Sequence, residues 1–216
     1  MSHLWVVILV HDLNFVVCPA PAPKENLKLK NNQMRKVILA INMSIDGCVS
    51  HMSLSPDEEV FWYFNDLMHQ DVDLIAYGRK MFEIMFPYWA EEANRETKVE
   101  KEFAQKITDL DKIVFSRTLD SAEYNTRIVR TDPVEELLKL KQAPGKNIYV
   151  GTVSMLPQLA QAGVIDEYHF FVVPVIVGQG PRLVEDGTLA GKLNLELAAT
   201  KTFKSGTIAL HYKKRA

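Results

Sequence analysis

The sequence predicts an α/β protein built on a mostly parallel sheet of about eight strands. Two observations lead to this fold class. Short apolar runs alternate with segments whose apolar residues repeat at helical spacing, and this order gives right-handed crossovers that place helices on both faces of a sheet. The last two apolar runs are separated only by the turn Lys204-Ser205-Gly206. They therefore predict an antiparallel hairpin at one edge of the sheet.

Each predicted strand is a short apolar run bounded by turn signals or polar residues. The strands are expected at residues 37–41, 74–77, 112–115, 126–129, 147–150, 168–177, about 193–203 and 207–213. Helices are expected at residues 56–69, 79–86, 96–110, 133–141 and 154–162. The first helix has the strongest start signal, because Ser55 can cap it, Pro56 suits its first position and Glu58 can complete a capping box.

The first 33 residues differ in composition from the folded domain, which is expected to span residues 34–216. His11 and Asp12 interrupt the apolar runs of this leader, so neither run is long enough to span a bilayer. We expect the leader to be disordered, or to result from a start codon set upstream of a working start at Met34. A weak signal or lipoprotein leader is the alternative, although Val17-Cys18 makes a poor cleavage site.

The composition is that of a soluble globular protein, with 47% hydrophobic and 24% charged residues. The net charge of −2 gives no indication of nucleic acid or an acidic membrane surface as the main partner. The two cysteines, Cys18 and Cys48, form neither a disulfide framework nor a metal-ligand spacing. A reducing, cytoplasmic location is therefore expected.

Polar and glycine residues follow three of the predicted strands, where an open α/β sheet binds its ligands. Gly78-Arg79-Lys80 follows the second strand and opens a helix, so its free N–H groups and cations favour a phosphate. Ser116-Arg117 follows the third strand, and Gly151-Thr152 follows the strand that ends at Val150. Each site alone is better explained as an ordinary turn with solvated polar groups. Together they favour a dinucleotide that carries an extra phosphate.

Several other chemistries have no signature in the sequence. No G-x-G-x-x-G segment opens a helix, and no P-loop occurs. The six histidines are expected to form no ligand cluster, so no metal is expected, and His169 and His211 are interpreted as hydrogen-bonded sheet residues. No zinc-deaminase signature is present.

The motifs between about Met34 and Lys213 resemble the dihydrofolate reductase-like family, in the branch that includes the C-terminal reductase domain of the bacterial riboflavin-biosynthesis deaminase-reductase. Each motif is common alone, but their order and spacing are specific. They are an S-x-D-G motif within residues 42–47, a D-x-x-x-x-G-R-x-T-[FYW]-E segment at 73–83, an aromatic pair at 88–89, a K-x-V-x-S strand at 111–116, a G-[GS]-x-x-L … L-I-D-E segment at 151–167 and a P-V-x-x-G-x-G loop at 174–180.

The resemblance implies a three-layer fold and hydride transfer from NADPH. The site residues that it implies fall into three groups by their expected contacts. These are Gly78, Arg79 and Lys80 at the cofactor phosphates, Ser116 and Arg117 at the adenosine 2′-phosphate, and Gly151 and Thr152 near the pyrophosphate and nicotinamide. Ala40, Ile41 and the loop at 44–47 would border the nicotinamide and substrate. A homodimer is also implied, with the strand at 168–177 either at its interface or fully buried in the sheet.

The chain departs from the family pattern at three places. Met81 replaces a threonine that contacts the cofactor, and Thr152 replaces a second glycine. The predicted helix from Asp57 to His69 contains no Arg or Lys, whereas the riboflavin branch uses arginines to bind a ribose phosphate. This absence argues against a phosphoribosyl substrate.

Reduction of a C=N or C=O bond needs a proton donor, and the resemblance places a carboxylate at the start of the first long helix. Counting from Pro56 favours Glu58, whereas helical phase favours Asp57, which lies on the apolar stripe that includes Val60. Burial there would raise the carboxyl pKa toward a useful range. The structural alternatives are a capping box for Glu58 and a favourable helix-dipole contact for Asp57. Asp46, in an Asp-Gly turn, is a third candidate for a catalytic or a loop-fixing role.

The sequence therefore predicts an NADPH-dependent reductase of a small pteridine-like or pyrimidine-like heterocycle. The named version is 5-amino-6-(5-phosphoribosylamino)uracil reductase of riboflavin biosynthesis. The alternatives are a stand-alone reductase with another substrate and a non-catalytic nucleotide-binding module on the same fold.

Overall fold

The computed structural model describes residues 34–54, 57–91 and 95–215. The predicted leader therefore lies outside the described residues, as do Ser55 and Pro56. No helix in the described ranges is long and apolar enough to cross a membrane.

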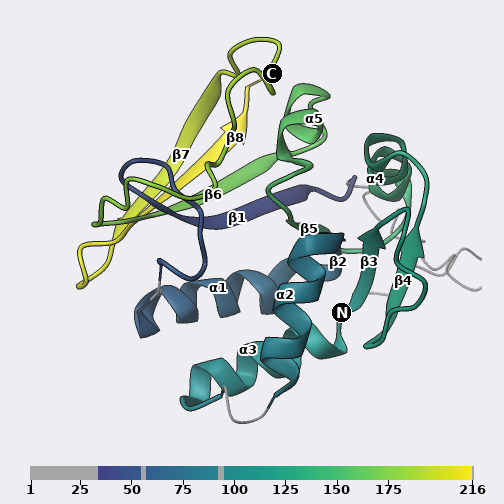
Figure 1. The fold of residues 1–216 in the computed structure, drawn as a ribbon, viewed down its shortest axis with the longest axis horizontal. Coiled ribbons are helices and arrows are strands. Elements are labelled where there is room, and N and C mark those ends of the chain that lie inside the picture. Colours follow the sequence, from purple (N-terminus) through teal and green to yellow (C-terminus); the bar gives the residue numbers. More distant parts are fainter. Residues whose placement is uncertain (1–33, 55–56, 92–94, 216) are drawn as a thin grey trace, which may run out of the picture. The chain divides into compact units, whose positions relative to one another are not determined.

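Eight strands form one mixed sheet in the order β4-β3-β2-β5-β1-β6-β8-β7 (Figure 1). The strands are β1 (Val37–Ser44), β2 (Val72–Gly78), β3 (Asp111–Phe115), β4 (Thr126–Val129), β5 (Asn147–Gly151), β6 (Glu167–Val173), β7 (Leu195–Thr202) and β8 (Ile208–Lys214). All pairs from β4 to β6 are parallel, and β8 pairs antiparallel with both β6 and β7. The predicted mostly parallel sheet with a closing antiparallel hairpin is confirmed.

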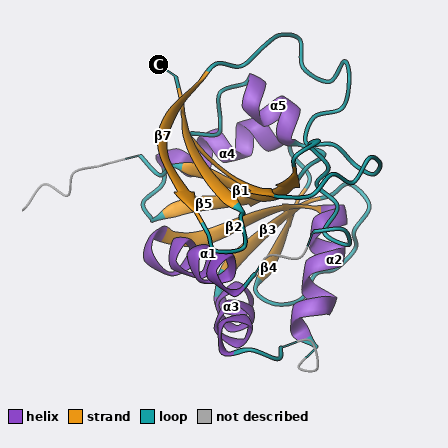
Figure 2. Ribbon diagram, turned by 90° about the vertical axis from the view of Figure 1, so that its left-hand side faces the viewer, coloured by secondary structure: helices purple, strands orange, loops and turns teal. Residues whose placement is uncertain are grey.

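Helices cover both faces of this sheet (Figure 2). The helices are α1 (Glu58–Asp71), α2 (Arg79–Ala90), α3 (Lys98–Asp109), α4 (Pro133–Gln142) and α5 (Leu156–Gln161). Because side chains alternate along a strand, Leu39 packs with Leu159 of α5 on one face. Its neighbour Ala40 packs with Val60 of α1 on the other. Clusters of aromatic residues fill the space beneath α2 and α3.

Helix α2 extends further than the sequence predicts, because it continues through Pro87 to Ala90 rather than ending near residue 86. A proline inside a helix removes one hydrogen bond and strains the preceding turn. The extra turn buries Trp89, whose ring lies edge-on to Phe61 and Phe103 at centroid distances of 5.9 and 5.1 Å. The burial of this large aromatic side chain offsets the cost of the proline.

Strand β6 ends at Val173, four residues earlier than predicted. Pro174 follows and has no N–H for the ladder. The strand pairs with β1 on one side and β8 on the other, so it is an interior strand, one of the two alternatives drawn from the sequence. Homodimerisation stays a prediction.

The start of α1 also differs from the sequence prediction. Asp57 has extended backbone angles, and its carboxylate accepts a hydrogen bond from the Val60 N–H at 2.9 Å. Asp57 is therefore the N-cap, and the predicted capping box of Ser55 with Glu58 is wrong. Glu58 instead occupies the first helical position. The remaining strong caps are at α3, where Thr97 and Glu100 form a capping box, and at α4, where Asp132 caps as predicted.

Candidate functional site

The structure brings the three predicted phosphate-binding segments to one edge of the sheet. In the parallel register, Tyr77 at the end of β2 lies opposite Gly151 of β5. Gly78 lies opposite Phe115 of β3, the residue before Ser116. The carboxyl ends of β3, β2 and β5 are thus adjacent, as the sequence predicted, and the residues that follow them share this edge.

The N-terminus of α2 is the most anion-ready feature of the edge. Gly78 is its N-cap, and no side chain accepts from the free N–H groups of the first turn. That turn contains no acidic residue, and it carries the exposed side chains of Arg79 and Lys80. The Arg79 guanidinium donates to Glu83 at 2.7 Å and to the hydroxyl of Thr118, so it reaches from α2 to the loop after β3. Helix dipole and side-chain charge therefore favour an anion at the same place.

The loop after β3 is held in a fixed turn by its own serine. The Ser116 hydroxyl accepts from the N–H groups of Thr118 and Leu119 at 3.2 and 2.9 Å. Arg130 donates to the carbonyls of Ser116 and Leu119 from the end of β4. The side chain of Arg117 is exposed on this loop. Arg130 was not among the predicted site residues. It directly follows the predicted strand at 126–129, and polar residues that follow strands were the signal used for the other three segments.

Gly151 has a packing reason for being glycine. A Cβ at this position would lie 2.3 Å from Cε1 of the buried Tyr77 ring, closer than any real contact. The next residue, Thr152, is buried, and its hydroxyl accepts from the N–H of Met155 at 3.2 Å. This bond caps the entry to α5, which begins at Leu156, two residues after its predicted start. Thr152 also lies against Gly78, since a Cβ on Gly78 would be 2.9 Å from the threonine hydroxyl.

Ala40 lies beside this edge in the middle of β1. The register of β1 with β5 pairs Leu39 with Val150, which places Ala40 level with Gly151. The carbonyl of Ala40 accepts from the Tyr149 hydroxyl at 3.0 Å. Burial raises the pKa of Tyr149 well above its usual range, so the phenol remains a donor.

The two carboxylates at the start of α1 have different surroundings. Asp57 uses Oδ1 to cap the helix, whereas its Oδ2 is buried without a hydrogen-bond partner among the described residues. Glu58 is exposed, and its carboxylate lies 3.4 Å from the indole nitrogen of Trp62. Val60, one turn from Asp57, packs in the same cluster as Ala40, so the first turn of α1 lies over β1. Of the two carboxylates, only that of Asp57 has a buried oxygen that could bind a ligand.

Asp46 is fully engaged in holding two loops together. Its carboxylate accepts from the Ser44 hydroxyl at 2.6 Å, from the N–H groups of Val177 and Gly178 at 3.0 and 2.9 Å, and from Arg182 at 3.1 Å. These hydrogen bonds, the one from Ser44 foremost, hold the pKa of Asp46 far below its usual range. An ionised carboxylate with four donors has no proton to give, which favours the loop-fixing role over the catalytic one.

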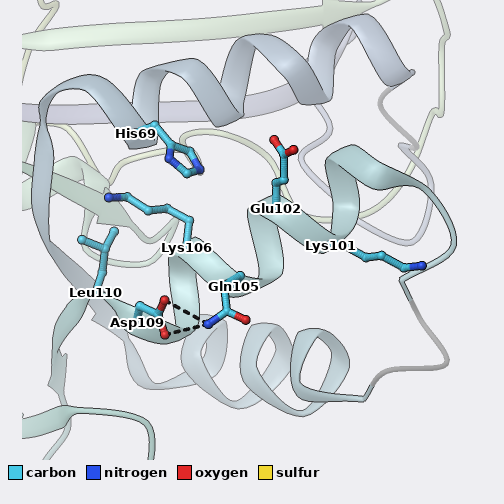
Figure 3. A pocket seen from close by; sticks show the side chains of 7 residues that line it. All are labelled: His69, Lys101, Glu102, Gln105, Lys106, Asp109 and Leu110. Carbon is cyan, nitrogen blue, oxygen red and sulfur yellow. Dashed lines mark hydrogen bonds between the residues drawn. The ribbon is translucent and has the colours of Figure 1, made fainter.

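A surface hollow lies between α1 and α3, at the opposite edge of the sheet (Figure 3). Its lining runs from His69 near the end of α1 to Leu110, the residue before β3 begins. It therefore faces the amino ends of the strands. Gln105 donates to both oxygens of Asp109 at 2.9 Å within it. None of the predicted site residues lines this hollow.

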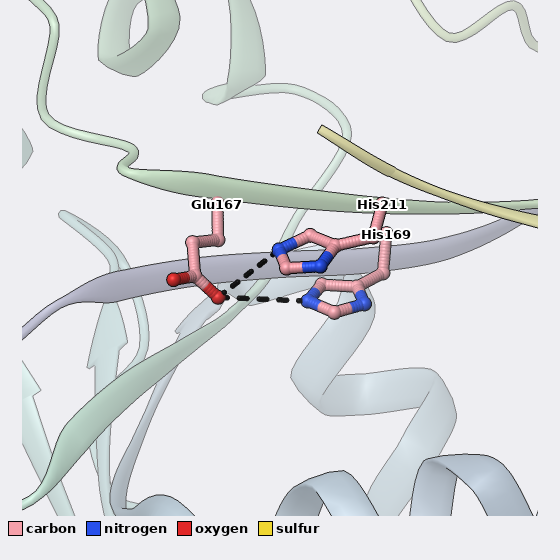
Figure 4. Close-up of side chains that lie close together, drawn as sticks. All are labelled: Glu167, His169 and His211. Carbon is pink, nitrogen blue, oxygen red and sulfur yellow. Dashed lines mark ion pairs between the residues drawn. The ribbon is translucent and has the colours of Figure 1, made fainter. Parts of the chain in front are cut away.

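The prediction that the histidines form no ligand cluster is wrong. Within the described residues, His169, His211 and Glu167 come together, and their ligand-type atoms all lie within 4.8 Å of one another (Figure 4). The Nε2 atoms of both histidines are buried and have no hydrogen-bond partner among the residues that the structure describes. Because the two histidines are 42 positions apart in sequence, linear spacing gave no sign of the cluster.

The strand order, the two helical layers and the closing hairpin define a dihydrofolate reductase-like fold. The structure is similar to dihydrofolate reductase from Enterococcus faecalis, solved with NADP(H), with a TM-score of 0.57 and 12% identity over 84% of this chain and 97% of that one. It is also similar to a putative riboflavin biosynthesis protein from Shewanella sp. PV-4, with a TM-score of 0.65 and 16% identity over 84% of this chain and 99% of that one.

Residues 35–209 match the family model described as the RibD C-terminal domain, so the chain belongs to that family. A curated relative is the protein YyaP of Bacillus subtilis (strain 168), which is 30% identical over 190 residues, covering 84% of this chain and 96% of YyaP. The family predicted from the motifs is confirmed.

Proposed function

We propose that the protein is an NADPH-dependent reductase that transfers hydride to a small heterocyclic substrate. The observation that carries the proposal is the convergence of Gly78, Ser116 and Gly151 at the carboxyl ends of three adjacent strands. Membership of the RibD C-terminal domain family supports it, as does the fold shared with a dihydrofolate reductase solved with NADP(H).

The residues at this edge fit a dinucleotide phosphate. The uncapped N–H groups of α2, with Arg79 and Lys80 in its first turn, would hold the pyrophosphate. The exposed guanidinium of Arg117 is free to turn toward a 2′-phosphate, and Arg130 stabilises the same loop from below. Gly151 and Thr152, level with Ala40, would border the nicotinamide.

NADPH, when bound, supplies the hydride. The protein must then supply the proton and the position of the substrate. Asp57 is suited to this because its buried Oδ2 has no partner among the described residues, while Oδ1 is fixed by the Val60 N–H. A proton carried on Oδ2 would pass to the substrate nitrogen, and the carboxylate that remains would accept a hydrogen bond from the new N–H. Asp46 would act only by fixing the loop that follows β1.

The charge of α1 limits the class of substrate. The helix carries no Arg or Lys along its length, so it offers no partner for a substrate phosphate. A neutral pteridine-like or pyrimidine-like ring therefore fits better than a phosphoribosyl pyrimidine. The substrate would then differ from that of the riboflavin-pathway reductase.

A non-catalytic nucleotide-binding module is a second candidate, and Thr152 is the observation in its favour. The side chain of Thr152 fills the space beside Gly78, and its hydroxyl is used by the Met155 N–H. The threonine side chain leaves less room for a cofactor to approach the backbone at the position where the family has a second glycine.

The test is the binding of NADPH and NADH to the full chain, followed by turnover with pterins and aminopyrimidines. We expect NADPH to bind more tightly than NADH.

Arg117→Ala should lower the affinity for NADPH by about 10- to 100-fold, the worth of one charge-assisted phosphate contact, and leave the affinity for NADH unchanged. Arg215→Ala, an exposed arginine near the end of β8, is the matched control. Binding of neither nucleotide by the folded chain would refute the proposal. NADPH binding without turnover of any heterocycle would favour the non-catalytic module.

A further inference from the structure

Two histidines lie directly opposite each other on the antiparallel pair β6 and β8. The register pairs His169 with His211, and their rings stack at a centroid distance of 4.1 Å with an interplanar angle of 11°. Glu167 precedes His169 by two residues, so the two side chains leave β6 on the same face. Figure 4 shows the carboxylate at the edge of both rings.

The three side chains direct their donor atoms at one point. Glu167 Oε2 lies 3.3 Å from Nε2 of His211 and 3.8 Å from Nε2 of His169. The side chain of His169 is only 5% exposed, and neither Nε2 makes a hydrogen bond within the part of the chain that the structure describes. A buried nitrogen without a partner costs free energy, so two such atoms facing one carboxylate oxygen need an explanation.

Groups around the cluster contact the outer atoms of two of these side chains. Tyr63 Oη lies 3.4 Å from Nδ1 of His169. The tautomer with its proton on Nδ1 would donate to the phenol oxygen and leave the Nε2 lone pair for an ion. The Lys36 ammonium donates to Oε1 of Glu167 at 2.8 Å, which leaves Oε2 turned toward the two histidines.

We propose that Glu167, His169 and His211 form a binding site for one divalent transition-metal ion of the zinc class, which would join β6 to β8. Two imidazoles and one carboxylate are a donor set that suits Zn²⁺ or Co²⁺ rather than Mg²⁺ or Ca²⁺. Ligand bonds of about 2.0–2.2 Å require the rings to tilt out of their parallel stack so that both lone pairs meet at the ion. Lys36 and Tyr63 keep their contacts to the outer atoms of the ligands. A fourth position remains for water.

The site does not depend on the proposed reductase activity. Ala40 of β1, which is predicted to border the nicotinamide, lies opposite His169. It offers the cluster no ligand, because its side chain is a methyl group and its carbonyl accepts from the Tyr149 hydroxyl. The competing occupant of the cluster is a single proton shared between the imidazoles and Glu167. A proton and a metal ion give different results with a chelator, and this distinguishes them.

The experiment titrates the metal-free full chain with Co²⁺, followed by visible absorption, and with Zn²⁺ in competition with a chromogenic chelator. We expect one ion per chain and the intense absorption of four-coordinate Co²⁺. Zn²⁺ should also raise the melting temperature, and chelator should reverse the rise. His211→Ala removes a direct ligand, so Zn²⁺ affinity should fall by at least about 100-fold, the upper end of the loss caused by removing a second-shell partner. Glu167→Gln, which keeps the side-chain shape, should also weaken binding.

Two controls address other ligands in the chain. His3, His11 and Cys18 of the leader are potential ligands, so His3→Ala/His11→Ala/Cys18→Ser must keep the site. His69→Ala, at an exposed histidine of α1, must do the same. The proposal is overturned if the folded wild-type chain binds no ion, if His211→Ala and Glu167→Gln bind as tightly as wild type, or if the leader variant abolishes binding. A melting temperature that responds to pH but not to Zn²⁺ or chelator would assign the cluster to a proton.

Discussion

The carboxylate of Asp46 lies 2.9 Å from the backbone N–H of Gly178, although 132 residues separate the two positions in the chain. Gly178 has a left-handed φ of 76°, and its N–H and that of Val177 both donate to this carboxylate. The S-x-D-G motif after β1 and the P-V-x-x-G-x-G loop after β6 are thus two halves of one structure. This gives a physical reason for the presence of both motifs.

Asp46→Asn should loosen both loops. The amide keeps one acceptor oxygen but presents an NH₂ group toward backbone N–H donors, and it loses the charge that attracts Arg182. We expect a lower melting temperature and increased hydrogen exchange at Val177 and Gly178. The control is Asp120→Asn, at an exposed position of the loop after β3, which should leave both quantities unchanged.

The same carboxylate predicts a pH dependence of stability. The folded-state pKa of Asp46 is lowered, so its contribution is fully present above the unfolded pKa near 3.8 and is lost as pH falls below that value. The wild-type chain should therefore lose more stability than Asp46→Asn between neutral and acidic pH, as measured by urea unfolding. Equal losses in the two proteins would show that the hydrogen bonds to Asp46 do not favour its ionised form.

Gly151→Ala should destabilise the fold through Tyr77. The added Cβ would lie 2.3 Å from the tyrosine ring, which is itself 1% exposed and has no space to move. We expect a loss of about 1–3 kcal/mol in the free energy of unfolding, typical of overpacking. Gly191→Ala is the matched control, because a Cβ there would contact nothing within 4 Å and the residue has no left-handed φ.

A double-mutant cycle separates overpacking from other effects at this position. Tyr77→Leu removes the ring that the new methyl group would strike, so Gly151→Ala should cost less in that background than in wild type. The unfolding free energies of the four proteins measure the coupling. An additive result would mean that the glycine is needed for backbone freedom rather than for the tyrosine.

Local sequence patterns predicted most of the fold because each element depends on neighbouring residues. Strand β4 occupies the predicted residues 126–129, and the start of α4 at Asp132-Pro133 follows from cap chemistry alone. Predictions failed where a distant contact decides the boundary. Helix α2 passes Pro87 because Trp89 meets two aromatic rings from other helices. Strand β6 ends at Val173, and beyond Pro174 the Val175 carbonyl and the Val177 N–H bond to the loop that carries Asp46.

The candidate site shows the same division. The meeting of the three candidate phosphate-binding segments was predictable, since parallel strands bring their carboxyl ends to one edge whatever lies between them. The pairing of His169 with His211 was not, because it depends on the register of the antiparallel hairpin and on β8 lying next to β6. Neither property follows from the spacing of the two histidines in the chain.

Lys112 is a buried ammonium whose role is structural. It is 1% exposed and donates to the carbonyls of Ile107, Thr108 and Leu110 at the end of α3. Lys112→Met would leave these carbonyls without a donor, at a cost of about 2–3 kcal/mol in the free energy of unfolding. Lys101→Met, at an exposed position of the same helix, should cost much less, because exposed charges contribute little. Equal losses in the two variants would argue against the capping role.

Burial lowers the pKa of Lys112 from 10.5 to about 8. Between these two pH values the unfolded chain binds more protons than the folded one, so stability should rise as pH increases from about 8 to about 10.5. The neutral amine still donates to the carbonyls, and the cost of burying its charge is gone. Lys112→Met should lack this rise in urea unfolding measured across the range. A wild-type stability that falls or stays level there, relative to the variant, would contradict the assignment.

Asp57→Asn tests the proposed proton donor, and Glu58→Gln is its neighbour control. The asparagine oxygen can still cap α1 through the Val60 N–H, so the fold should persist. The amide at the Oδ2 position cannot deliver or retain a proton, so we expect kcat/KM with a reducible heterocycle to fall by about 10²- to 10⁴-fold, the usual worth of general acid catalysis. NADPH affinity should remain within about 3-fold of wild type, a change of less than 1 kcal/mol. The reason is that Asp57 caps α1, whereas the candidate phosphate-binding segments follow β2, β3 and β5. Glu58→Gln should keep both activity and binding, since Glu58 is exposed and its carboxylate lies beside Trp62. If the two variants lose activity equally, or if Asp57→Asn lowers only the melting temperature, Asp57 is a helix cap and the proton comes from elsewhere.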